Sequence, residues 1–120
     1  MYFRLLKESS KVLSLTLAGN GSIGTDGAES LIMAAKDSRT LQKLNLSACG
    51  VKSPLDVTFF DALGHAVSQN DGESSFTELD LSHNLITFVD KERLAKEWDL
   101  KSSGESSSCL QNNLCILTKV

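Results

Sequence analysis

The sequence has few aromatic residues, only three cysteines and no long hydrophobic run. Aromatic residues make up 6% of the 120 residues, so a core must be built from Leu, Ile, Val and Ala. Cys49, Cys109 and Cys115 are too few and too unevenly spaced for a disulfide framework, which favours an intracellular compartment, cytoplasmic or nuclear. No apolar run approaches the roughly 20 residues that cross a bilayer, so we predict no membrane span.

Basic charge is also scarce. Twelve Lys and Arg residues against fifteen Asp and Glu residues give a formal net charge of −3. Proteins that bind nucleic acid or anionic membranes normally carry a clustered basic excess. In the longest stretch without an acid, residues 38–55, the basic residues Arg39, Lys43 and Lys52 are scattered. We therefore expect direct binding neither to nucleic acid nor to a membrane.

Three nine-residue segments follow one pattern, L-x-x-L-x-L-x-x-N/C, which is the pattern of leucine-rich repeats. The segments are residues 12–20 (VLSLTLAGN), residues 41–49 (LQKLNLSAC) and residues 76–84 (FTELDLSHN). Val12 and Phe76 replace the first leucine, and successive segments begin 29 and 35 residues apart. The alternating leucines predict short strands that bury one face and present the other.

The ninth residue of each segment stands where the chain turns away from the strand. Asn20, Cys49 and Asn84 occupy this position, and their side chains are predicted to hydrogen-bond backbone groups of the turn. A helix then returns the chain, so that the next strand lies parallel to the first.

Three segments have the period of amphipathic helices. They are residues 27–36, residues 56–69 and residues 89–100. The predicted buried faces are Ala28, Leu31, Ile32 and Ala35 in the first helix, Val57, Phe60, Leu63 and Val67 in the second, and Leu94, Ala95 and Trp98 in the third. Residues 2–9 are predicted to be the tail of an earlier helix.

Residues 20–31 (NGSIGTDGAESL) resemble the turn and helix start of ribonuclease-inhibitor-type leucine-rich repeats, with one extra residue after Asn20. The resemblance covers roughly residues 10–100, and residues 41–100 are also similar to the terminal repeats of Tonsoku-type nuclear scaffolds. It implies an α/β solenoid, with a short parallel sheet on the concave side and helices on the convex side. It also implies a non-catalytic scaffold that needs no cofactor.

The chain is predicted to contain three parts. About three repeats occupy residues 1–100, with an uncapped N-terminal end. A Ser-rich linker follows at residues 101–108, and a terminal strand or cap at residues 109–120. We interpret the chain as the C-terminal part of a larger solenoid or a truncated relative of one.

Three motifs allow other interpretations. Residues 19–24 (GNGSIG) match a dinucleotide-binding turn, but the second strand ends in Leu-Ser-Ala-Cys without the acid that would bind the ribose. Asp80, Ser82 and His83 are residue types of a hydrolase triad, yet neighbours on one strand rarely converge. The three cysteines lack the paired spacing of a zinc site, so we predict no metal.

The exposed strand face is the candidate binding surface. Its predicted members are Ser14, Thr16, Ala18, Lys43, Asn45, Ser47, Glu78, Asp80 and Ser82, with His83 at the rim. Two acids at one end predict a protein or peptide partner with basic side chains. Two alternatives stay open. The face lacks an aromatic anchor, so it can also be ordinary solvated surface. The chain can also be a structural subunit that stacks end-on in a larger assembly, and its oligomeric state is undetermined.

Overall fold

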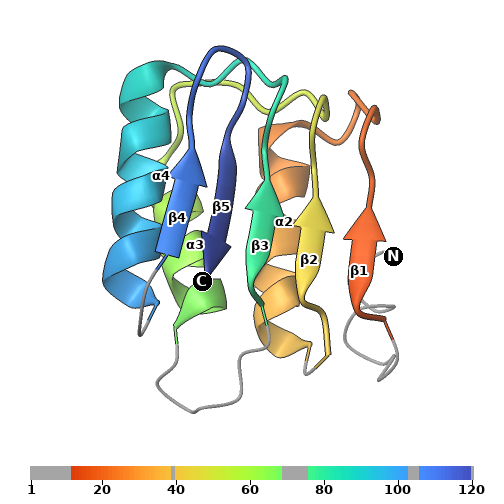
Figure 1. Ribbon diagram of the computed structural model, residues 1–120. Coiled ribbons are helices and arrows are strands. Elements are labelled where there is room, and N and C mark those ends of the chain that lie inside the picture. The colour runs from red at the N-terminus through yellow and green to blue at the C-terminus, as the bar shows by residue number, and fades with distance from the viewer. Residues whose placement is uncertain (1–11, 39, 69–75, 103–105, 120) are drawn as a thin grey trace.

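A computed structural model describes residues 12–38, 40–68, 76–102 and 106–119, and these residues form one sheet with three helices behind it (Figure 1). The predicted residues 2–9 helix lies outside the described residues. In chain order the elements are β1 (Ser14–Thr16), α2 (Gly24–Asp37), β2 (Lys43–Asn45), α3 (Val57–Val67), β3 (Glu78–Asp80), α4 (Phe88–Lys101), β4 (Ser106–Cys109) and β5 (Ile116–Lys119).

The sheet has the strand order β1-β2-β3-β5-β4. The three repeat strands are parallel and in register, so that Leu15, Leu44 and Leu79 lie side by side. The last two strands form a hairpin, and β5 pairs antiparallel with β3. This architecture confirms the predicted leucine-rich-repeat solenoid and adds an antiparallel hairpin to its C-terminal end.

The core lies between the sheet and the helices. The repeat leucines of β2 and β3 are buried, and so are the predicted apolar faces of α2 and α4. Phe76 packs edge-on against Trp98 with ring centroids 5.8 Å apart. Two of the scarce aromatic residues therefore meet where the third repeat packs on its helix. Over the described residues, none of the helices has the length and apolar character needed to cross a membrane.

The eighth residue of every repeat segment has a left-handed backbone. Its φ angle is 84° at Gly19, 51° at Ala48 and 59° at His83. This conformation turns the chain out of the strand toward the helix, and glycine adopts it without steric cost. Ala48 and His83 adopt it as well, so the repeat backbone imposes the turn even where the residue type does not favour it.

A buried carboxylate ties the second repeat to α4. Asp90 Oδ2 accepts hydrogen bonds from Ser53 Oγ at 2.6 Å and from the backbone N–H of Leu55 at 3.1 Å. The Asp90 N–H donates to Thr87 Oγ1, which caps the helix. The Thr-x-x-Asp spacing is a recognisable capping pattern. It fixes the start of α4 against the preceding repeat.

The structure differs from the sequence predictions at Val57, at residues 101–108 and at Ser82, the last of which is described with the candidate site. The helical period places Val57 on a buried face, but Val57 is the first residue of α3 and is 66% exposed. Residues 101–108 were predicted to be a linker. Instead, Lys101 is still helical and residues 106–108 lie in β4, which pairs antiparallel with β5.

Candidate functional site

Two rows of side chains cross the strand face of the sheet. In register, Ser14 is followed by Lys43, Glu78 and then Thr118. The second row consists of Thr16, Asn45, Asp80 and Ile116. Strand pairing therefore brings together residues that the sequence separates by more than 60 positions, and it aligns six of the predicted concave residues: Ser14, Thr16, Lys43, Asn45, Glu78 and Asp80.

The side chains of the second row also support their own turns. Thr16 Oγ1, Asn45 Oδ1 and Asp80 Oδ1 each accept a hydrogen bond from the backbone N–H two residues later, at 3.4, 3.0 and 2.9 Å. Thr16 and Lys43 are exposed, whereas Asn45, Glu78 and Asp80 are half-buried. These hydrogen bonds hold the polar side chains of the second row in place, and the side chains remain partly accessible to solvent.

Ser82 does not belong to the exposed surface. Its side chain is 2% exposed, and its Oγ accepts a hydrogen bond from the backbone N–H of Cys115 at 3.0 Å. The hairpin that follows α4 covers it, so a partner cannot reach it. His83 is exposed, as its position in the repeat predicts.

The hairpin extends the surface in a way that sequence reasoning missed. Thr118 lies beside Glu78, and Ile116 lies beside Asp80. Ile116 gives the acidic end of the surface a half-buried aliphatic neighbour. Alternation in residues 116–119 (ILTK) is the only signal for this, and it does not say which strand the segment joins.

Two of the three turn residues, Cys49 and Asn84, hydrogen-bond from one repeat to the repeat before it. Asn84 Oδ1 accepts from the backbone N–H groups of Cys49 and Val51, and its Nδ2 donates to the carbonyl of Leu46 at 3.0 Å. Cys49 Sγ in turn donates to the carbonyl of Leu17 at 3.1 Å. Cys49 and Asn84 therefore each bind the backbone of the repeat before their own.

The glycine-rich segment at residues 19–24 uses its backbone donors internally. The N–H of Gly19 donates to the carbonyl of Ser47, and the N–H of Gly24 donates to the carbonyl of Cys49, both at 2.9 Å. A side chain on Gly50 would lie 2.2 Å from the carbonyl oxygen of Gly21, so this loop packs directly on the next turn. A phosphate-binding loop needs free N–H groups at the helix start, and these two are occupied.

The cysteines offer little chemistry. Burial raises the pKa of the Cys115 thiol to about 11 and also raises the pKa of Cys49, which keeps both thiols protonated at neutral pH. Cys109 is exposed on β4. Within the described parts of the chain, no group of three His, Cys, Asp or Glu side chains is placed to hold a metal ion.

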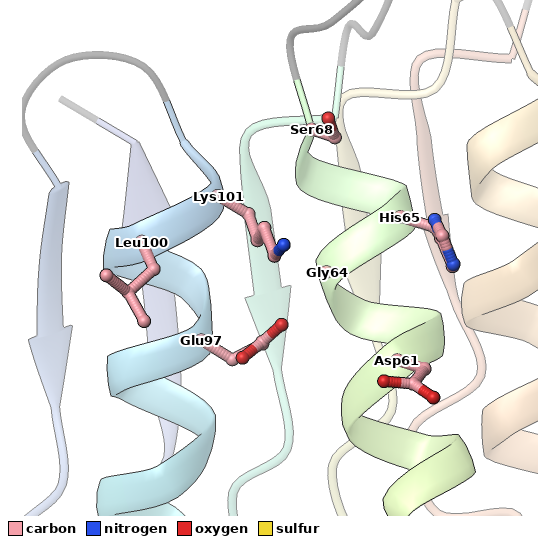
Figure 2. Close-up of a pocket in the computed structure, with 7 residues that line it drawn as sticks. All are labelled: Asp61, Gly64, His65, Ser68, Glu97, Leu100 and Lys101. Atoms are coloured by element: carbon pink, nitrogen blue, oxygen red, sulfur yellow. The ribbon is translucent and has the colours of Figure 1, made fainter.

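A pocket of about 360 Å³ lies on the opposite side of the molecule, between α3 and α4 (Figure 2). The charged ends of Glu97 and Lys101 project over Gly64, whose missing side chain leaves room for the Glu97 carboxylate. Asp61 and His65 extend from α3, spread along the helix rather than turned toward one another. The pocket contains no residue predicted from the repeat pattern.

Comparison with known proteins agrees with this geometry. A sequence profile described as Leucine Rich repeat matches residues 8–31. Among solved structures, the fold is similar to that of the tropomodulin C-terminal domain from Caenorhabditis elegans, with a TM-score of 0.62 at 18% sequence identity. The match covers 82% of this chain and 56% of that one, so the chain spans little more than half its length. No curated protein matches the sequence.

Proposed function

We propose that this chain binds a partner protein or peptide through its concave strand face. The observation that carries the proposal is the in-register alignment of Lys43, Glu78 and Thr118 beside Asn45 and Asp80. Leucine-rich repeats generally serve as protein-binding scaffolds, and the strand face is their continuous surface. We also propose that its repeats are of the ribonuclease-inhibitor type and similar to the terminal repeats of Tonsoku-type scaffolds.

The surface favours a partner with basic side chains. Glu78 and Asp80 stand two residues apart on one face of β3, which spaces their α-carbons by about 7 Å. Ile116 beside Asp80 suits the aliphatic stem of an arginine or lysine, whose charged end then reaches the carboxylate. Lys43, across from Glu78, would select an acid or a carbonyl at the neighbouring position of the partner.

A double variant that replaces both acids by their amides tests this surface with little change in shape. Glu78→Gln and Asp80→Asn remove both negative charges, and the amide oxygen that the second substitution introduces can still accept the Ser82 N–H. The matched control is Asp61→Asn with Glu97→Gln, which removes two acids from the opposite side of the molecule. We expect affinity capture from cell lysate, quantified by mass spectrometry, to lose its main protein with the first variant and to retain it with the control.

The control also separates the possible errors. Loss of capture with the control alone assigns binding to the pocket between α3 and α4. Equal capture by the unmodified chain, the concave-face variant and the control variant contradicts the concave-face proposal. A captured protein should also associate more slowly as ionic strength rises, because exposed charges are screened over about 8–10 Å.

A second candidate function is end-on assembly, and the first repeat favours it. Leu15 and Leu17 are half-buried and Leu13 is 54% exposed, whereas the leucines that match Leu15 and Leu17 in the second and third repeats are covered. Sedimentation velocity over a range of concentrations tests this. Leu13→Asp should abolish any self-association, and Leu85→Asp, at an exposed leucine elsewhere, should leave it intact. A chain that stays monomeric at all concentrations contradicts self-assembly.

A further inference from the structure

Among the described strands, the outer strand of the hairpin, β4, pairs with β5 alone and so leaves its other edge open. Because the N–H of Lys119 donates to Thr77 and the N–H of Leu81 donates to Cys115, the odd-numbered residues of β5 point their backbone groups toward β3. The backbone groups of Thr118 and Ile116 therefore point toward β4, where they meet Ser107 and Cys109.

By the same alternation, Ser106 and Ser108 point their N–H and C=O groups away from the sheet, at the outer edge beside α4 (Figure 1). Proteins usually block such an edge with lysine, proline, a bulge or a covering element. The sequence of β4 is Ser-Ser-Ser-Cys and three of its four side chains are exposed, so within the strand itself only its short length protects the edge.

A groove of about 420 Å³ is lined by residues of α4 and by Leu110, the residue that directly follows β4. At one end, the hydroxyl of Ser106 donates to the carboxylate of Asp99, which joins strand and helix. At the other end, Leu110, which directly follows β4, lines the groove together with Val89, 66% exposed, and Ala95. The groove thus offers an aliphatic lining close to Ser106 and Ser108, whose outward backbone groups bond to no other described residue.

We propose that β4 and this groove bind an extended peptide by strand addition. An unpaired strand edge is complemented by another extended backbone, and the adjacent groove receives every second side chain of the added strand. This surface is separate from the acidic end of the concave face, and the proposal does not depend on the function proposed above.

The lining also specifies the chemistry of the peptide. Arg93 is engaged elsewhere, because its guanidinium lies 4.2 Å from the ring centroid of Phe60 and 4.0 Å from Asp90. Glu92 and Lys96, of opposite charge, remain at the groove. The complementary ligand is therefore an extended segment of near-zero net charge with an aliphatic side chain pointing between Val89 and Leu110.

The test uses linear heptapeptides selected against the full chain from a random phage-displayed library. The most enriched peptide is synthesised, and its dissociation constant is measured by fluorescence polarisation. Ser108→Pro removes an outward N–H, while the β4–β5 ladder keeps its bonds through Ser107 and Cys109. We expect Ser108→Pro to weaken binding by about tenfold or more, and Ser108→Ala, which keeps the N–H, to change it less than about twofold.

A peptide-side experiment makes the result independent of the folding of the proline variant. Two peptides are compared, one N-methylated at its odd-numbered amides and one at its even-numbered amides. Methylation should abolish binding where the methylated amides face β4 and spare it where they face away. The proposal is overturned if no peptide is enriched, if both methylated peptides bind equally, or if binding is lost with Glu78→Gln and Asp80→Asn and kept with Ser108→Pro. A dimer that Ser108→Pro dissociates in the absence of peptide assigns the edge to a second copy and also overturns it.

Discussion

The repeat leucines are buried to different extents at the two ends of the set of parallel strands. At the first repeat, Leu15 and Leu17 are half-buried, whereas Leu79 and Leu81, at the same positions of the third repeat, are at most 1% exposed. The difference arises from the neighbour. The third repeat has β5 beside it, and Leu117 of that strand pairs with Leu79. An antiparallel hairpin thus covers the core as a further parallel repeat would.

The turn residues show the same contrast. Asn20 and Asn84 both donate to the carbonyl three residues earlier, that of Leu17 at 2.6 Å and that of Leu81 at 2.9 Å. Asn84 in addition binds the backbone of the preceding repeat through both of its side-chain polar atoms. The identical residue in the same motif therefore has a local role at one end and an inter-repeat role at the other.

The largest effect is expected from the leucines of the strands. Leu79→Ala should lower the free energy of unfolding by about 3–4 kcal/mol, because it leaves a cavity in a closed core. Leu15→Ala should cost about 1 kcal/mol, because this side chain is already in partial contact with solvent. Urea unfolding followed by circular dichroism measures both. Equal losses would mean that the two ends are covered alike in solution.

Substituting the turn asparagines should also cost more stability in the third repeat than in the first, with a smaller difference than for the leucines. Asn84→Ala leaves the N–H groups of Cys49 and Val51 without their acceptor, so we expect a loss of about 2–3 kcal/mol. Asn20→Ala removes one local hydrogen bond and should cost less than about 1 kcal/mol. The same unfolding experiment applies. A loss at Asn20 as large as that at Asn84 would contradict the inter-repeat role.

The buried thiols report on the order in which the ends open. At pH 8.5 a disulfide reagent should label exposed Cys109 at once, while Cys115, whose pKa is about 11, and Cys49, whose pKa is also raised, react only after local unfolding. Cys49 donates to the carbonyl of Leu17 in the less covered repeat. We expect it to react about tenfold faster than Cys115, a difference of about 1.4 kcal/mol. Mass spectrometry of peptides locates the label, and the reverse order would place the weaker end at the hairpin.

The smallest effect concerns Lys119 at the base of the hairpin. Burial lowers the pKa of its ammonium, and the Nζ atom has no hydrogen-bond partner among the described residues. The folded state therefore binds its proton less tightly than the unfolded state, and the contribution of Lys119 to stability rises with pH between the lowered pKa and the ordinary value near 10.5. Lys119→Met should stabilise the chain at pH 7 by less than about 1 kcal/mol. Thermal melts at pH 7 and pH 10 should show the gain shrinking at the higher pH, and a constant gain would exclude the charge as its cause.

Local pattern alone was sufficient for the repeats. The alternation of leucines in residues 12–20, 41–49 and 76–84 gives strands at each site, because burying one face requires the two-residue period. The 3.6-residue period likewise locates the three helices to within a few residues. Asn20, Cys49 and Asn84 were identifiable as turn residues from their place in the motif.

Non-local contacts were not readable in this way. Ser82 fits the exposed alternation of β3, yet a hairpin more than 20 residues later buries it. Residues 106–108 have the composition of a linker, and only pairing with β5 makes them a strand. In both cases the deciding energy comes from a partner that is distant in sequence, so no local pattern encodes it.

The sequence by itself determined the repeat and the face that each strand buries, because these follow from periodicity within about ten residues, and the helix between successive segments made the strands parallel. The tertiary structure decided how the stack ends: which edge stays open at β4, which leucines are covered and which asparagine reaches a neighbouring repeat. Hydrogen bonds of a strand edge depend on what lies beside it, and only the folded chain places that neighbour.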